Sequence, residues 1–192
     1  RYGMICALSG TMQKAIEMAS TYANTRTQFG NKLASFTAIQ EKIGRMTLAH
    51  FVTQSHAYMI RYFFIKKFVC LFINGFFFLS NSSGVIDKGM TDFQLEAAIG
   101  KIVASDSAWW VCDEALQIFG GMGYIKDTGI EKMLRDTRIF RIFEGANEIL
   151  RLFIALTGLQ YAGGHLREIQ KAMKNPMANL GLIFMEASKR LK

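Results

Sequence analysis

Apolar side chains recur at helical spacing along most of this chain. Between residues 2 and 24, small and apolar residues follow the 3.6-residue period of an α-helix at Ile5, Leu8, Met12, Ile16, Ala19 and Ala23. The same spacing predicts further helices over residues 37–60, 91–119 and 129–137, and from Asn147 onward. Outside residues 61–84, no segment alternates as a strand does. The pattern therefore predicts an all-α fold, an up-down four-helix-type bundle with short connections.

Short polar and glycine-containing stretches mark the predicted helix ends. TAIQ (37–40) and TDFQ (91–94) have the spacing of a capping box, so each is expected to open a helix. The glycine pair 120–121 is expected to end the third helix, because glycine is common just after helix C-termini. Residues 24–35 break the period and are predicted to be a loop. The pair 163–164 is expected to loosen the chain before two weaker helical segments.

Residues 61–84 differ from the rest of the chain. Seven of the chain's 16 phenylalanines lie in the range from Phe63 to Phe78. The segment's mainly apolar stretch without charge, Phe68–Leu79, has 12 residues, whereas a membrane-spanning helix needs about 20 apolar residues. Two interpretations stay open: a hairpin that docks on a membrane surface, or a translated intron, since phenylalanine codons are rich in T. The second is favoured, because removing the segment restores a short loop between two helices.

Charge and composition limit the kinds of partner that the chain is expected to bind. The net charge is +8, but basic and acidic residues are interleaved and no nucleic-acid-binding motif appears. We therefore predict no nucleic-acid partner. The three cysteines form no CxxC and the three histidines have no metal-ligand spacing, which favours reduced thiols and no metal. The first residues contain neither a starting Met nor a targeting signal, so the chain is interpreted as a fragment or a processed product.

Three short motifs interrupt the helical pattern. Residues 26–30 (RTQFG) combine an arginine, whose fork suits phosphate, with a flat aromatic ring. Residues 117–123 (QIFGGMG) offer glycines that let a ligand approach the backbone closely. Residues 143–147 (FEGAN) place Glu144 directly after the apolar pair Ile142-Phe143. Apolar surroundings would raise the pKa of a carboxyl group, which suits a general base.

Taken together and in this order, the motifs resemble the C-terminal helical domain of the flavin-dependent acyl-CoA dehydrogenases. The carriers of the resemblance are RTQFG, QIFGGMGY, LRDTRIFRIFEG and NEILR. The tail KNPMANLGLIFMEASKRLK is similar to the start of the extension in the very long-chain group of that family. The resemblance implies a bundle domain over 1–162, with 61–84 as an atypical insertion, and the start of the extension over 163–192.

The resemblance also implies a site. Glu144 matches the base that removes the proton alpha to the thioester, while FAD accepts a hydride from the neighbouring carbon to give a trans-2-enoyl-CoA. Gly145 and Arg1 match substrate contacts. The positions that match contacts to FAD are Arg26, Gln28, Phe29, Gln117, Gly120, Gly121, Ala146, Asn147 and Glu148. The family usually has Thr where Ala146 stands. Several of these contacts reach the cofactor of a neighbouring subunit, which implies a homo-oligomer.

The implied whole protein would oxidise long or very long fatty acyl-CoA in mitochondrial β-oxidation, with electron-transfer flavoprotein as its acceptor. Lysines and arginines among apolar residues near the C-terminus suggest peripheral contact with the matrix side of the inner membrane. The family's N-terminal and middle domains are missing, so this chain alone is expected to form an incomplete active site. The alternative is a catalytically silent helical module with an assembly or binding role in mitochondria. Some family members carry the base on the first helix instead.

Overall fold

The computed structural model describes residues 1–73 and 94–174, including the side chains of residues 1–61 and 94–164. The chain divides into two compact units, Arg1–Leu150 and Arg151–Lys192. The second predicted capping box, part of the Phe-rich segment and the last basic residues of the tail lie outside the described residues.

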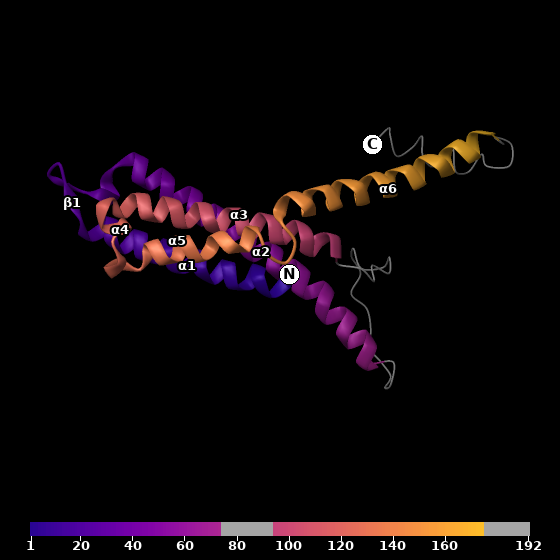
Figure 1. The fold of residues 1–192 in the computed structure, drawn as a ribbon, viewed down its shortest axis with the longest axis horizontal. Helices are drawn as coiled ribbons and strands as arrows, with labels where there is room; N and C mark the ends of the chain where they lie inside the picture. The colour runs from indigo at the N-terminus through magenta and orange to yellow at the C-terminus, as the bar shows by residue number, and fades with distance from the viewer. Residues whose placement is uncertain (74–93, 175–192) are drawn as a thin grey trace. The chain divides into compact units, whose positions relative to one another are not determined.

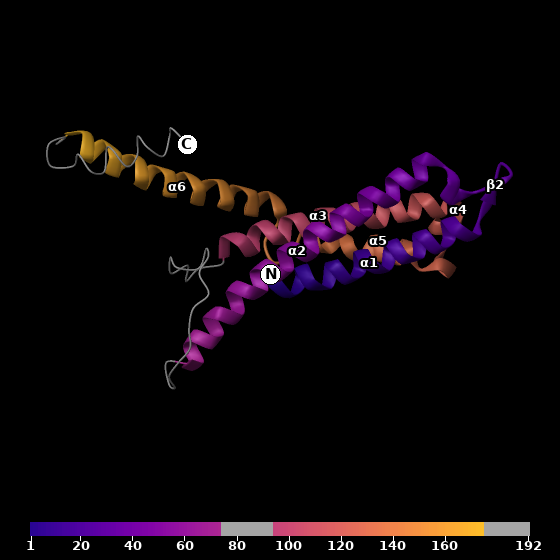
Figure 2. The same cartoon turned by 180° about the vertical axis from the view of Figure 1, so that it is seen from behind.

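The first unit is a bundle of helices. Its elements in chain order are α1 (Tyr2–Thr25), β1 (Thr27–Gln28), β2 (Asn31–Lys32), the 3₁₀ turn η1 (Leu33–Ser35), α2 (Thr37–Ile73), α3 (Gln94–Phe119), α4 (Gly121–Tyr124), the 3₁₀ turn η2 (Lys126–Thr128), α5 (Ile130–Arg138) and the 3₁₀ turn η3 (Ile139–Arg141). Helices α1, α3, α5 and the first part of α2 lie side by side, with α1, α2 and α3 running alternately in opposite directions (Figures 1 and 2). The predicted all-α bundle is confirmed. Within this unit, the fourth helix of the bundle is α5, which packs on α3. Helix α6 (Asn147–Lys174) starts in this unit and continues in the second.

Small side chains bring α1 and α3 close together. Seven alanines on these two helices are fully buried: Ala15, Ala19, Ala23, Ala98, Ala104, Ala108 and Ala115. Most are four residues apart, so they share one face of each helix. Ile5, Leu8 and Met12 extend the same buried face of α1, as the sequence pattern predicts. Each such large apolar side chain stabilises the fold by roughly 1.5–3 kcal/mol, so the helix pair forms a firm support.

Packing is close near the start of α3. A Cβ placed on Gly100 would lie 2.7 Å from Ile5 Cδ1, 2.9 Å from His56 Cδ2 and 3.1 Å from Ile60 Cδ1. Real Cβ atoms do not come so close to other atoms, so glycine is needed where α3 crosses α1 and α2. The residue that follows Gly100 is therefore held in a fixed place.

Helix α2 is longer than the sequence pattern predicts. It continues beyond residue 60 to Ile73, so the first part of the Phe-rich segment is helical. Residues 61–73 contain no glycine or proline, and nothing in them interrupts backbone hydrogen bonding. The predicted capping box at residues 37–40 is not formed. Thr37 is already helical, and Gln40 Nε2 instead donates to the carbonyl of Ala34 at 2.9 Å.

The predicted loop after α1 contains a small hairpin. Thr27 pairs with Lys32 and Gln28 with Asn31 in two antiparallel strands. Phe29 and Gly30, between them, have φ values of 50° and 79°. A two-residue turn with both φ values positive matches the right-handed twist of its strands. This conformation is sterically unfavourable for phenylalanine. The pattern of apolar residues did not predict the turn.

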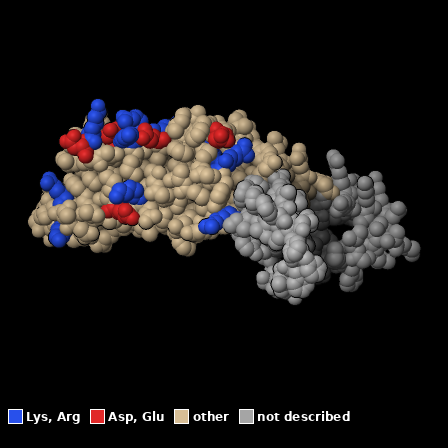
Figure 3. Space-filling model, turned by 90° about the horizontal axis from the view of Figure 1, so that it is seen from below, with Lys and Arg blue, Asp and Glu red and all other residues tan. Residues whose placement is uncertain are grey.

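Helix α6 passes through the glycine pair that was expected to loosen it. It runs without interruption to Lys174. A glycine inside a helix costs only about 1 kcal/mol relative to alanine, and good helix formers follow the pair. Among the described helices, none is long and apolar enough to cross a membrane. On the face shown in Figure 3, acidic side chains lie among the basic ones over the described part of the chain.

Candidate active site

The turn between η3 and α6 carries Glu144 in an unusual backbone conformation. Its φ is 56°, and that of Gly145 is 99°. A non-glycine residue with positive φ is strained and persists only where its surroundings hold it. A Cβ on Gly145 would come within 3.2 Å of Leu150 Cδ2, so both conformation and space call for glycine there. The turn must therefore be held by bonds from outside it.

Those bonds come from a lysine buried on α3. Lys101 is fully inaccessible to solvent. Its ammonium Nζ donates to the carbonyl oxygen of Gly145 at 2.7 Å and to Asn147 Oδ1 at 2.8 Å. The lysine therefore ties the turn and the first residue of α6 to the closely packed start of α3.

Asn147 extends the network back to α3. Its amide Nδ2 donates to Ser105 Oγ at 2.9 Å and to Asp106 Oδ1 at 3.0 Å. The carboxylate of Asp106 also accepts from Arg141 Nε at 2.8 Å. Asn147 is fully buried, and both ends of its side-chain amide are used. Its side chain thus supports the turn, and a flavin contact from it would require these bonds to break.

Burial and a nearby cation lower the pKa of Lys101. Removal from water is the larger cause, and the positive charge of Arg1 adds to it; Asp106, Glu148 and Glu144 act in the opposite sense. Arg1 itself approaches the turn, since its Nε donates to the carbonyl oxygen of Glu144 at 3.3 Å. Two cations therefore hold the two successive carbonyl groups of the Glu144–Gly145 turn.

The Glu144 side chain is exposed, contrary to the expectation that apolar neighbours bury it. Ile142 and Phe143 are themselves 53% and 40% exposed. Phe143 packs edge-on against Phe140, with 5.1 Å between ring centroids, rather than over the carboxylate. Among the described side chains, none shields Glu144 from water. Desolvation of its carboxylate would come from a bound molecule or from polypeptide outside the described residues.

Four of the nine residues predicted to contact FAD line a groove at a second place. Arg26, Gln28, Gly120 and Gly121 line a groove of about 490 Å³ together with Tyr22, Leu33, Ile118, Phe119 and Met122. The rings of Tyr22 and Phe119 stack, with centroids 4.3 Å apart. A Cβ on Gly120 or Gly121 would meet nothing within 4 Å, so the backbone there faces open space. The groove thus has an arginine, an amide, an aromatic pair and open backbone.

The remaining predicted contacts lie beside the groove or at the turn. Phe29 is 91% exposed at the tip of the hairpin, and Gln117 is exposed on the last turn of α3. With its amide oxygen toward Arg26, Gln28 accepts from the guanidinium at 2.7 Å. Ala146 and Glu148 flank Asn147 at the start of α6, far from the groove.

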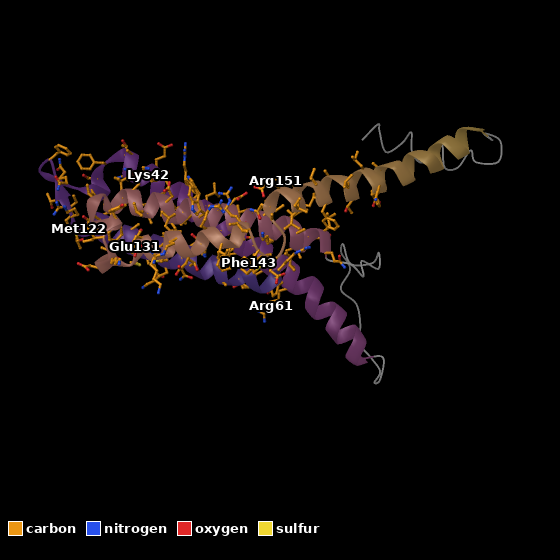
Figure 4. The ribbon with its side chains drawn as sticks, viewed as in Figure 1. Lys42, Arg61, Met122, Glu131, Phe143 and Arg151 are labelled. Carbon is orange, nitrogen blue, oxygen red and sulfur yellow. The ribbon has the colours of Figure 1, made fainter. Side chains whose placement is uncertain are left out.

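The two predicted parts of the site are separated by the length of α1. Arg1 and Arg26 flank this helix of 24 residues, and at 1.5 Å per residue they lie about 36 Å apart. Figure 4 shows the same separation, with Phe143 near the start of α1 and Met122 at the end that carries the hairpin. One flavin dinucleotide cannot touch both parts of a single chain.

The sequence matches the family described as acyl-CoA dehydrogenase, C-terminal domain, over residues 1–62 and 82–159. The match covers more than half of the chain, so the chain belongs to this family, and the resemblance drawn from its motifs is confirmed. The match is interrupted within the Phe-rich segment. Whether that segment is a hairpin or a translated intron stays a prediction.

Individual relatives point to one branch of the family. The chain is 47% identical over 192 residues to the very long-chain specific acyl-CoA dehydrogenases, mitochondrial, of Rattus norvegicus and Homo sapiens, of which it spans 26%. It is also similar to an acyl-CoA dehydrogenase from Bacillus anthracis solved in complex with FAD. There the TM-score is 0.73 at 32% identity, over 91% of this chain and 29% of the other.

Sequence reasoning found the turn but missed the network beneath it. Lys101, Ser105, Asp106 and Arg141 were not among the predicted site residues. One signal was present: Lys101 and Ser105 are four residues apart on a helix that is otherwise buried and apolar on that face. A polar pair on such a face needs partners, but the sequence does not say which ones.

We predict that Asn147→Ala lowers the free energy of unfolding by about 2–4 kcal/mol. The change removes three hydrogen bonds and leaves buried groups on α3 without partners. Urea unfolding followed by circular dichroism measures the effect. The exposed Asn24, whose amide bonds only to its own helix, is the matched control, and Asn24→Ala should change stability by less than about 0.5 kcal/mol. Equal effects at both positions would contradict the network.

Proposed function

We propose that this chain is the C-terminal part of a flavin-dependent acyl-CoA dehydrogenase. The complete protein converts long or very long fatty acyl-CoA to trans-2-enoyl-CoA in fatty acid β-oxidation. The observation that carries the proposal is the strained, exposed Glu144 on a turn held by a buried network. A glutamate with no chemical role would gain nothing from such a turn.

Glu144 acts as the base in this proposal. Its carboxylate takes the proton from the carbon alpha to the thioester as the hydrogen on the beta carbon leaves as hydride, and a double bond forms between the two carbons. A bound FAD supplies the hydride acceptor. The backbone N–H of Glu144 would donate to the thioester oxygen and stabilise the charge that develops there. Arg1 and Gly145, at the same turn, suit contacts to the substrate.

The groove at the other end of α1 suits part of the flavin dinucleotide. Its residues fit such a ligand, because Arg26 offers a fork for phosphate and the open backbone at Gly120-Gly121 allows close approach. The separation of about 36 Å along α1 means that the groove of one chain would serve the Glu144 of another. We therefore propose a homo-oligomer in which neighbouring subunits share cofactors.

Partners and location follow from the relatives. Several are named mitochondrial, and one similar structure is titled as an electron transferring flavoprotein of Acidaminococcus fermentans. We propose a mitochondrial protein that passes electrons to an electron-transfer flavoprotein. Peripheral contact of the basic C-terminal tail with the inner membrane is part of the same proposal.

In the complete protein, Glu144→Gln should retain FAD but lower the turnover of palmitoyl-CoA by at least about 100-fold, because an amide cannot accept the alpha proton. Flavin content is read from its absorbance, and turnover from reduction of an electron-accepting dye. Asp136→Asn, at an exposed position of α5, controls for the loss of a surface carboxylate. Activity near wild type in Glu144→Gln would remove Glu144 as the base and favour a base on the first helix, whereas no turnover by the wild type would favour a catalytically silent helical module.

If neighbouring subunits share cofactor sites, two inactive variants should complement each other in a mixed oligomer. Arg26→Ala should weaken FAD retention, and Glu144→Gln should abolish chemistry. In mixed oligomers the intact Arg26 of one subunit would serve the intact Glu144 of its neighbour, so co-expression should restore a substantial part of the activity. The activity should be measured both after mixing the two purified variants and after co-expressing the two chains. If neither experiment restores activity, each chain uses its own groove.

A further inference from the structure

Lys101 occupies a place that is unfavourable for a cation. It is fully buried, Arg1 lies close enough to lower the pKa of its ammonium group, and its partner Asn147 is the first residue of α6. Helix N-termini carry partial positive charge, so they repel cations. A buried charge of this kind is weak evidence for stability, because an apolar side chain of similar size often serves a fold equally well.

The hydrogen bonds of Lys101 show how its ammonium group holds the turn. Its ammonium holds the carbonyl of Gly145 at 2.7 Å, while Arg1 holds the preceding carbonyl, that of Glu144. Fixing two successive carbonyl groups fixes both peptide planes that follow Glu144. Together with the peptide that precedes Glu144, these planes set the backbone angles of Glu144, including its positive φ, and with them the direction of its side chain.

We propose that Lys101 is a positioning residue, which holds the Glu144–Gly145 turn in its left-handed conformation and thereby directs the Glu144 carboxylate. The inference rests on the proposed role of Glu144 as the base. Lys101 itself does not reach the substrate, because it is buried beneath the turn. Its effect on the reaction passes through the carbonyl of Gly145 and the side chain of Asn147.

The test uses the complete, FAD-loaded protein with Lys101→Met, which keeps an unbranched side chain one atom shorter and removes the donor. The control is Met12→Ala, which opens a cavity in the buried face of α1 and destabilises the bundle away from the turn. For each variant we would measure Tm, flavin content, kcat and KM for palmitoyl-CoA well below Tm, and deuterium uptake of peptides covering residues 142–150.

Lys101→Met should lower kcat by about 10- to 100-fold, as expected when a reacting group is misplaced by about 1 Å. KM and flavin content should change less than about threefold, and deuterium uptake over 142–150 should rise. Met12→Ala should lower Tm with kcat within about twofold of wild type and unchanged uptake at the turn. If Lys101→Met does not fold, Lys101→Gln, which keeps a shorter donor, should show the same split between kcat and KM.

The inference is overturned if kcat of the folded Lys101 variant stays within about twofold of wild type, or if Met12→Ala lowers kcat equally. It is also overturned if loss of flavin accounts for the whole decrease. Failure of the proposed function has a different signature, namely that wild type shows no turnover of palmitoyl-CoA or that Glu144→Gln is fully active. Increased uptake over 142–150 in Lys101→Met would still establish the positioning contact in that case.

Discussion

The bond from the Lys101 ammonium to the Gly145 carbonyl is the contact on which the candidate active site depends. The turn that carries Glu144 has two successive residues with positive φ, a conformation that is unstable without external bonds. Lys101 can supply such a bond only because α3 is fixed beside it by the close packing at Gly100. The core of the bundle therefore determines where Glu144 points, although Glu144 lies on the surface.

In the proposed function, the bundle also separates two chemical tasks. Its long helices place the turn at one end and the groove with Arg26 and the glycine pair at the other. Helix length makes the distance about 36 Å, too great for one cofactor in one chain. An incomplete site at each end is what a subunit of a shared assembly requires. The exposure of Glu144 and of the groove agrees with surfaces that other polypeptide segments and ligands would cover.

Much of the fold could be predicted because apolar residues recur at helical spacing in α1 and α5, and because α3 is a long, mainly apolar segment that ends at a glycine pair. Errors arose where local signals were weak. Nothing in residues 61–73 stops α2, and the glycines at 163–164 cost too little to interrupt α6. The motifs identified Glu144, but its burial was overestimated, because adjacent apolar residues in a turn need not pack over their neighbour. Lys101 was missed, because its partners Gly145 and Asn147 lie more than 40 residues away in sequence.

A double-mutant cycle on the rate of flavin reduction tests the central claim most directly. Lys101→Met and Asn147→Ala are compared singly and together in the complete, FAD-loaded protein under single-turnover conditions with palmitoyl-CoA. If both residues act by holding one turn, the double variant should be only slightly slower than the slower single variant. If the fold-decreases of the two single variants multiply, the residues act independently, and the single-turn account is contradicted.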